Sequence, residues 1–199
     1  MTAEHDPIDD PNGDQNGDPN GDQNGDPQEI ERVFLLDALP DIPESLNSGA
    51  VCWKIEQGYL SASDPAPDQV ITEGRLRRVT HADGSMTFTH TIKSGLGLVR
   101  VERERTLNRA EFEALWPATE GRRILKTRLR IDVKGQIWEI DDFSDRALVL
   151  AEAELPTVET ALPIPEWLQP RIIREVTEEG AFRNFHLATR KGFHTPDPP

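Results

Sequence analysis

The sequence has 199 residues, with 22 lysines and arginines against 36 aspartates and glutamates, and its formal net charge is −14. This acidic balance argues against non-specific binding to nucleic acid or to an anionic membrane, because both require a positive surface. No apolar run approaches the roughly 20 residues that cross a membrane, and the N-terminus lacks the basic and apolar regions of a signal peptide. We therefore expect a cytoplasmic protein with a small-molecule partner, and the sequence leaves monomer and homodimer open.

Residues 1–28 form an acidic repeat in which DPNGDQNG occurs at 10–17 and again at 18–25. This segment has eight acidic residues and no lysine or arginine, so the remainder has a net charge of only −6. Its composition offers nothing that could form a core. We predict a disordered tail over 1–28, a folded domain over 29–190 and a loose C-terminal tail over 191–199.

The folded part is mainly a series of short β-strands, separated by Gly, Pro, Asn and Asp. The predicted strands are 29–36, 50–60, 73–79, 87–93, 98–107, 124–133, 136–143 and 147–155. Lys134 and Gly135 lie between two of them and predict a tight hairpin. Asn108 predicts the start of a helix that runs through Trp116, and a second helical region is expected within 166–190. This α+β, mainly-β pattern favours an antiparallel barrel or a strongly curved sheet.

Charged residues recur at i, i+2 inside these strands, so each set shares one face of its strand. The sets are Glu29/Glu31, Arg75/Arg77, Glu102/Glu104, Lys126/Arg128/Arg130, Glu139/Asp141 and Glu152/Glu154, and Lys93 ends the fourth strand. Any one set could simply face water. Together, however, carboxylates favour a hard divalent cation such as Mg²⁺ or Mn²⁺, and basic groups favour phosphate. The pattern predicts a site for a metal-bound polyphosphate.

An ordered series of motifs covering about residues 29–189 resembles the CYTH, or triphosphate tunnel metalloenzyme, family. The motifs are Glu29-Ile30-Glu31, Gln57-Gly58-Tyr59-Leu60, Arg75-Leu76-Arg77, Thr91-Ile92-Lys93, Arg100-Val101-Glu102-Arg103-Glu104, Lys126-Thr127-Arg128, Trp138-Glu139-Ile140-Asp141, Ala151-Glu152-Ala153-Glu154-Leu155 and Arg174-Glu175-Val176-Thr177. The resemblance implies an eight-stranded antiparallel closed tunnel barrel with a few flanking helices. It also implies metal-dependent hydrolysis of inorganic triphosphate, polyphosphate or a triphosphate-bearing metabolite.

The resemblance further implies roles for particular residues. The expected metal ligands are Glu29, Glu31, Glu152 and Glu154, and the expected phosphate ligands are Arg75, Arg77, Lys93, Lys126 and Arg128. The expected catalytic residues are Lys93, Glu102, Glu104 and Asp141, of which the three acids would position metal or water.

Val33 departs from the family motif E-x-E-x-K, because it stands where the motif has lysine. By alternation Val33 shares the face of Glu29 and Glu31, whereas Arg32 projects to the other face. Losing one charge-assisted contact costs about 1.5–3 kcal/mol. Two alternatives to a hydrolase therefore stay open. One is an adenylate cyclase, and the other is a non-catalytic module that binds polyphosphate or nucleotide.

Overall fold

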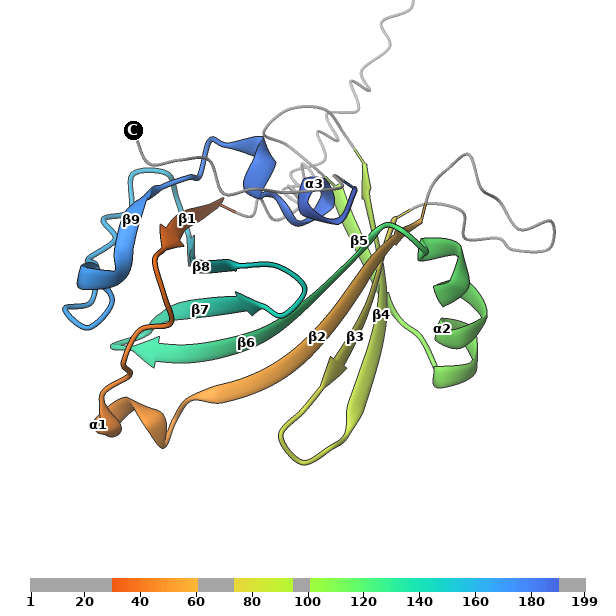
Figure 1. The fold of residues 1–199 in the computed structure, drawn as a ribbon, viewed down its shortest axis with the longest axis horizontal. Helices are drawn as coiled ribbons and strands as arrows, with labels where there is room; N and C mark the ends of the chain where they lie inside the picture. Colours follow the sequence, from red (N-terminus) through yellow and green to blue (C-terminus); the bar gives the residue numbers. More distant parts are fainter. Residues whose placement is uncertain (1–29, 61–73, 95–100, 190–199) are drawn as a thin grey trace, which may run out of the picture.

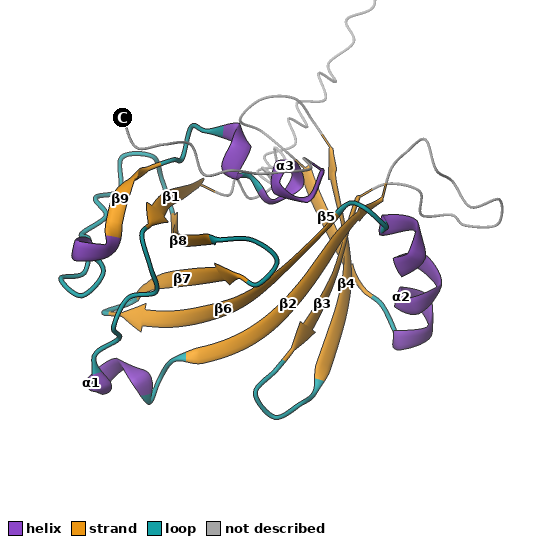
Figure 2. Cartoon of the chain, viewed as in Figure 1, coloured by secondary structure: helices purple, strands orange, loops and turns teal. Residues whose placement is uncertain are grey.

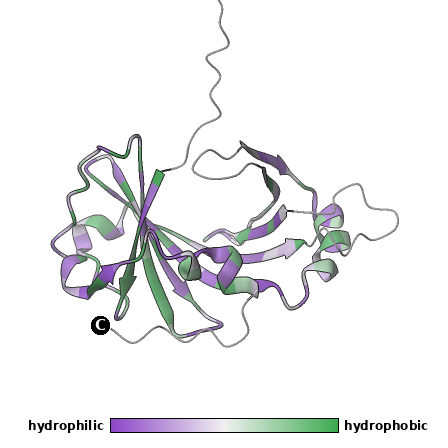
Figure 3. Ribbon diagram, turned by 90° about the horizontal axis from the view of Figure 1, so that it is seen from above, coloured by the Kyte–Doolittle hydropathy of each residue, from purple (hydrophilic) through white to green (hydrophobic). Residues whose placement is uncertain are grey.

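The alternating segments form one antiparallel sheet in the computed structural model, which describes residues 30–60, 74–94 and 101–189. The strands are β1 (Ile30–Leu36), β2 (Val51–Leu60), β3 (Gly74–Thr80), β4 (Met86–Ser94), β5 (Val101–Thr106), β6 (Arg123–Val133), β7 (Gln136–Phe143), β8 (Leu148–Leu155) and β9 (Ile172–Glu175). The predicted tails, 1–28 and 191–199, lie outside the described residues. Hydrophilic and hydrophobic residues alternate along the strands, as Figure 3 shows.

The helices are few and short, and no helix in the described ranges is long and apolar enough to span a membrane. They are α1 (Glu44–Asn47), α2 (Arg109–Leu115) and α3 (Asn184–Thr189), with single 3₁₀ turns η1 (Trp116–Thr119), η2 (Gln169–Arg171) and η3 (Gly180–Phe182). The mainly-β architecture expected from the sequence is confirmed (Figure 2).

The predicted closed eight-stranded barrel is wrong. The sheet has nine strands in the order β5-β4-β3-β2-β6-β7-β8-β1-β9, and no ladder joins β5 to β9 among the described residues. The missed strand, β9, lies within 166–190, where a helical region was expected and where α3 is found. It pairs with the free edge of β1, the edge through which closure onto β5 would otherwise occur. The result is a strongly curved open sheet (Figure 1).

A bidentate ion pair fastens β9 to β1. Arg32 donates from Nε and Nη2 to the two carboxylate oxygens of Glu175, at 2.9 and 2.6 Å. Thr177 adds a second link, because its hydroxyl accepts the Val33 backbone N–H at 3.0 Å and donates to Glu175 at 2.7 Å. The carboxylate therefore binds both a cation and a hydroxyl, which compensates for the shortness of a four-residue strand.

Local sequence signals confirm two other predictions. Lys134 and Gly135 have φ angles of 56° and 88°, as a tight hairpin between β6 and β7 requires, and Asp132 accepts the Gly135 N–H at 2.7 Å. Asn108 caps α2 with a reciprocal capping box. Its side chain accepts the Glu111 N–H at 2.9 Å, and its own N–H donates to the Glu111 carboxylate at 2.7 Å.

Two apolar clusters lie on the convex face of the sheet. At one end, Phe112 and Leu115 of α2 pack against Leu76 and Phe88 of β3 and β4. At the other end, the second cluster includes Trp138 of β7 and, from beyond the sheet, residues of the loop after β8. Burial of these faces stabilises the curvature, at about 25 cal/mol for each Å² of apolar surface removed from water.

A third apolar cluster lies on the concave face, which the sequence pattern had assigned to charges alone. Leu35, Phe143 and Leu150 pack there with Leu187 of α3 and Phe182 of η3. The helix α3 lies on this face between the two wings of the sheet (Figure 1). The concave face therefore has an apolar end covered by α3, and the charged residues occupy the rest.

Candidate functional site

Strand register places the predicted charged residues on one face of the sheet. Directly opposed residues of an antiparallel pair project to the same side, and Arg128 opposes Asp141 while Glu139 opposes Glu152. The same register continues through β2 to Arg77 of β3, opposite Gln57. This concave face carries Glu31, Arg75, Arg77, Glu104, Lys126, Arg128, Glu139, Asp141, Glu152 and Glu154. Glu29 and the side chains of Lys93 and Glu102 lie outside the described part.

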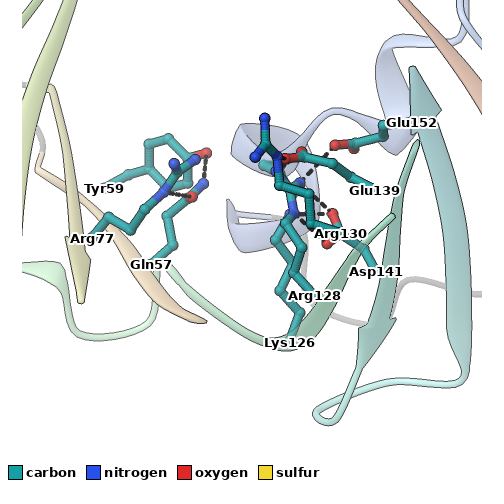
Figure 4. A network of polar contacts seen from close by, with 10 residues as sticks. Gln57, Tyr59, Arg77, Lys126, Arg128, Arg130, Glu139, Asp141 and Glu152 are labelled. Carbon is teal, nitrogen blue, oxygen red and sulfur yellow. Dashed lines mark hydrogen bonds and ion pairs between the residues drawn. The ribbon is translucent and has the colours of Figure 1, made fainter. Parts of the chain in front are cut away.

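Arg128 binds three carboxylates from two strands (Figure 4). Its Nε and Nη2 donate to the two oxygens of Asp141 at 2.7 and 2.6 Å. Nη2 also donates to Glu152 at 2.7 Å, and Nη1 donates to Glu139. Lys126 donates to the same Asp141 and lies 3.4 Å from the side-chain oxygen of Asn184 in α3. These five charged residues, Lys126, Arg128, Glu139, Asp141 and Glu152, are here called the Arg128 network.

The Arg128 network is buried, and its carboxylates neutralise its cations. Burial opposes charge on Arg128, yet Asp141 and Glu152 hold its pKa above the ordinary value. Burial also opposes charge on Asp141, but Lys126 and Arg128 hold the pKa of that carboxyl below the ordinary value. The pKa of Lys126 is lowered by burial and by Arg128 despite the attraction of Asp141. Removing one partner would leave an uncompensated charge inside the protein.

A second arginine, Arg77 on β3, is partly buried and has an uncharged partner. Its Nε donates to Oε1 of Gln57 at 3.2 Å, and Nε2 of Gln57 donates to the Tyr59 hydroxyl at 2.5 Å. Gln57 is fully buried, and no carboxylate among the described residues forms an ion pair with Arg77. Burial lowers the pKa of Arg77 to about 10, with repulsion from Arg75 and Arg128 adding to the effect. These three residues, Gln57, Tyr59 and Arg77, are here called the Arg77 group.

Arg75 lies next to this group on the same strand and faces a carboxylate at longer range. Its Nη2 donates to the Thr91 hydroxyl at 3.1 Å and lies 3.6 Å from the Glu104 carboxylate. Thr91 in turn donates to Glu104 at 2.7 Å. The Glu104 side chain is about half exposed, so its attraction for Arg75 is screened by water. Arg75 and Arg77 together make this part of the face positive.

Among the described residues, the acids expected to bind metal do not gather into one cluster. Glu31 and Glu154 oppose each other directly on β1 and β8, whereas Glu152 is bound to Arg128. Within the described ranges, no three His, Cys, Asp or Glu side chains are arranged to hold a metal ion. A magnesium ion in proteins is often held by only one or two carboxylates, with substrate phosphates and water completing its shell. Glu31 and Glu154 fit that arrangement.

Comparison with known proteins identifies the family. No family model matches the sequence. A curated inorganic triphosphatase from Nitrosomonas europaea is 37% identical over 165 residues, which cover 80% of this chain and 96% of that protein. The chain belongs to the triphosphate tunnel metalloenzyme family. An inorganic triphosphatase from Acetivibrio thermocellus is 29% identical over 162 residues, covering 80% of this chain and 92% of that protein.

The fold agrees with this membership. A crystal structure of an inorganic triphosphatase superimposes with a TM-score of 0.56 at 34% identity, covering 82% of this chain and 95% of that one. The resemblance inferred from the motif order is thereby confirmed. The coverage also shows that the match spans nearly the whole length of these relatives rather than one shared motif.

Val33 gives this triphosphate tunnel metalloenzyme an apolar residue at the motif lysine. The side chain is half-buried against the concave apolar cluster, and its residue opposes Glu152 on β8. Arg32 does not replace the missing cation, because it projects to the other face and binds Glu175. Glu152 therefore has Arg128 as its ion-pair partner in the described part.

Gln57 and Tyr59 had no role in the sequence-based assignment, yet the structure brings both into the site. They are spaced i, i+2 on β2, so they share the concave face. Their polarity alone is a weak signal, because one glutamine and one tyrosine on a strand are ordinary. The more informative signal is their position in the motif Gln57-Gly58-Tyr59-Leu60, with a glycine between them. A side chain at Gly58 would collide with Thr119, whose nearest atoms lie 2.6 Å from the point that a Cβ would occupy.

Proposed function

We propose that this protein hydrolyses inorganic triphosphate with Mg²⁺ or Mn²⁺ and releases phosphate. Two relatives that match along most of their length are inorganic triphosphatases. The observation that carries the proposal in this chain is Arg77, a partly buried guanidinium held by an amide rather than a carboxylate. A cation in that setting binds a polyanion strongly, because the anion supplies the negative charge that the protein does not provide.

The basic residues divide into two roles in this proposal. Arg77 and Arg75 contact the phosphates, since an amide anchors the first and a threonine hydroxyl accepts from the second. Lys126 and Arg128 direct their donors to Asp141 and its neighbours and so hold the adjoining strands together, and their role as phosphate ligands stays a prediction. Lys93, which opposes Glu102 on the last strand pair, stays a predicted phosphate ligand.

The carboxylates Glu31 and Glu154 would hold the metal ion, together with Glu29. When bound, the divalent ion supplies Lewis acidity toward phosphate oxygens and charge neutralisation. Glu104, beside Arg75 and about half exposed, is the described carboxylate best placed to accept a proton from water near the phosphates. Asp141 instead maintains the Arg128 network, because both its oxygens accept bonds from buried cations.

Phosphate release from tripolyphosphate tests this function directly. The purified chain should release phosphate only when Mg²⁺ or Mn²⁺ is present, and less from ATP or thiamine triphosphate. The double variant Glu31→Gln, Glu154→Gln should lower turnover by at least about a hundredfold, equivalent to about 2.7 kcal/mol. Glu120→Gln is the matched control, because Glu120 is exposed in the turn before β6. Equal activity of the double variant and the control would contradict the metal assignment.

The other candidate activities have distinct outcomes in the same assay. Cyclic AMP formed from ATP would replace the hydrolase by an adenylate cyclase. Tripolyphosphate that binds in calorimetry without any phosphate release would indicate a non-catalytic binding module. A cytoplasmic location and the absence of nucleic-acid binding belong to the same proposal, and size-exclusion chromatography with light scattering would decide between monomer and homodimer.

A further inference from the structure

Gln57 joins two residues of the concave face while being itself inaccessible to solvent. It lies on β2 opposite Arg77 of β3 and Ile124 of β6, in the middle of the sheet. Its amide oxygen accepts from Arg77 at 3.2 Å, and its amide nitrogen donates to Tyr59 at 2.5 Å. Both ends of the amide are therefore used, and Figure 4 shows the three side chains projecting toward the same space as the Arg128 network.

The contact with Gln57 uses only one of the donors of Arg77. A guanidinium has five N–H groups, and Gln57 takes the one on Nε. The four N–H groups of Nη1 and Nη2 make no hydrogen bond with the described residues. These are the two nitrogens that form parallel hydrogen bonds to a phosphate or carboxylate. The arginine is thus anchored at Nε, and the donors of both terminal nitrogens stay available for a ligand.

The chemical identity of the anchor matters because it leaves the charge of Arg77 intact. Arg128 shows the opposite case, in which carboxylates from two strands occupy the donors and cancel the charge. An amide has the same shape as a carboxylate and accepts the same Nε–H hydrogen bond without adding a negative charge. A neutral anchor also avoids repelling an incoming polyanion, and a carboxylate at this depth would do so at low dielectric.

Tyr59 holds the other end of the amide. Burial raises the pKa of Tyr59 to about 12, so its hydroxyl stays neutral, and its oxygen accepts the amide N–H. The ring packs edge-on against Phe185 of α3, with the centroids 5.2 Å apart. Because a guanidinium only donates, the amide oxygen must face Arg77 and the amide nitrogen is left to Tyr59. Tyr59 and α3 therefore hold the far end of Gln57, which in turn holds Arg77.

We propose that Gln57 is a positioning residue for triphosphate, which anchors Arg77 through a neutral hydrogen bond so that both terminal nitrogens bind one phosphate group. The inference rests on the proposed function and deepens it, because it assigns the phosphate contact to a preorganised arginine fork. Gln57 does not touch the substrate. Its effect passes through Arg77 and therefore disappears when Arg77 is absent.

A double-mutant cycle tests this role. Gln57→Glu should raise KM for tripolyphosphate by about ten- to a hundredfold, the cost of one charge-assisted contact, with a smaller change in kcat. Gln57→Met, which keeps the length of the side chain, should raise KM by a smaller factor of about three to ten. In an Arg77→Ala background Gln57→Met should not change KM further, whereas Gln57→Glu should still raise it, because the new carboxylate repels the polyanion directly. Gln169→Met, on an exposed residue of η2, is the control and should leave KM unchanged.

Equal effects of Gln57→Met with and without Arg77 would overturn the proposal, because a merely structural glutamine acts independently of Arg77. An unchanged KM in Gln57→Glu would overturn it as well. Calorimetry of tripolyphosphate binding to the same variants separates this inference from the proposed function. Loss of the Gln57–Arg77 coupling in binding contradicts the positioning role. Retained coupling without hydrolysis contradicts only the hydrolase.

Discussion

Arg128 is buried and Arg77 is partly buried on the same concave face, but their partners differ in charge. Arg128 donates to Asp141, Glu139 and Glu152, whereas Arg77 donates to the amide of Gln57. The environment accordingly raises the pKa of Arg128 and lowers that of Arg77. One guanidinium is already neutralised by the protein, and the other carries a charge that the protein does not compensate.

The comparison shows that a basic residue in a charged interior can have either a structural role or an anion-binding role. A fully paired arginine cross-links strands and contributes to stability, since its hydrogen bonds are all within the fold. An arginine with a neutral anchor destabilises the unliganded fold but binds an anion more strongly for that reason. The partners on neighbouring strands decide which of these roles a given arginine has.

Removing the paired arginine should have the largest effect on stability. Arg128→Ala leaves Asp141 beside Lys126 alone and deprives Glu139 and Glu152 of their shared cation. We expect the free energy of unfolding to fall by about 3–5 kcal/mol, measured by urea denaturation. Arg130→Ala is the control, because Arg130 is 42% exposed and lies 3.6 Å from Glu139. It should change stability by less than about 1 kcal/mol.

Removing the uncompensated arginine, Arg77, should lower ligand affinity without lowering stability. Arg77→Gln takes away a partly buried positive charge that no described carboxylate pairs with, so thermal stability without ligand should stay equal or rise. Tripolyphosphate affinity should fall by about ten- to a hundredfold, as measured by calorimetry on the folded variant. A large loss of stability with unchanged affinity would reverse the roles that we assign to the two arginines.

Lowering the pH should reduce stability through the Arg128 network rather than through Arg77. Since the folded-state pKa of Asp141 lies below its unfolded value, the unfolded chain binds more protons as pH falls below about 4. Stability from Asp141 is therefore present above that pH and is lost as pH falls through the folded pKa, by about 2 kcal/mol. Thermal unfolding between pH 6 and 2 should show a shallower slope for Asp141→Asn than for the unaltered protein.

Restoring the family lysine should have the smallest effect. Val33→Lys places an amine on the concave face opposite Glu152, which now has Arg128 as its cation. Partial burial of the new charge limits the gain, so we expect affinity or turnover for tripolyphosphate to rise by about three- to tenfold. Leu39→Lys adds the same charge at an exposed position outside the sheet. An equal response in both variants, or none in Val33→Lys, would contradict the placement of residue 33 at the site.

Much of the sheet could be predicted from its sequence, because charged and apolar residues alternate along β1 to β8. The helix start at Asn108 and the hairpin at Lys134-Gly135 could also be predicted, because both depend on local sequence signals. The strand β9 was missed because four residues carry almost no periodic signal. Its pairing with β1 includes a contact between Arg32 and Glu175, which are 143 residues apart in the sequence.

The difference between Arg77 and Arg128 could not be predicted from the sequence. Both belong to basic pairs spaced i, i+2, and nothing in the pairs distinguishes them. The distinction comes from strand order, because β6 lies beside the acidic strand β7 whereas β3 lies between β2 and the threonine-bearing strand β4. Chain order does not predict that β2 separates β3 from β6. The facing residues, Gln57 and Asp141, become known only with the register.

An open sheet must protect two edges that a barrel would not have. One edge strand, β9, has only four residues, and the other, β5, has six. On β5 the side chains of Arg103, Glu104 and Arg105 are all exposed and alternate in charge. Short length and exposed charge are the features that prevent an edge from acting as a template for another chain. The protein can therefore keep its concave face accessible to a large anion without becoming prone to polymerise.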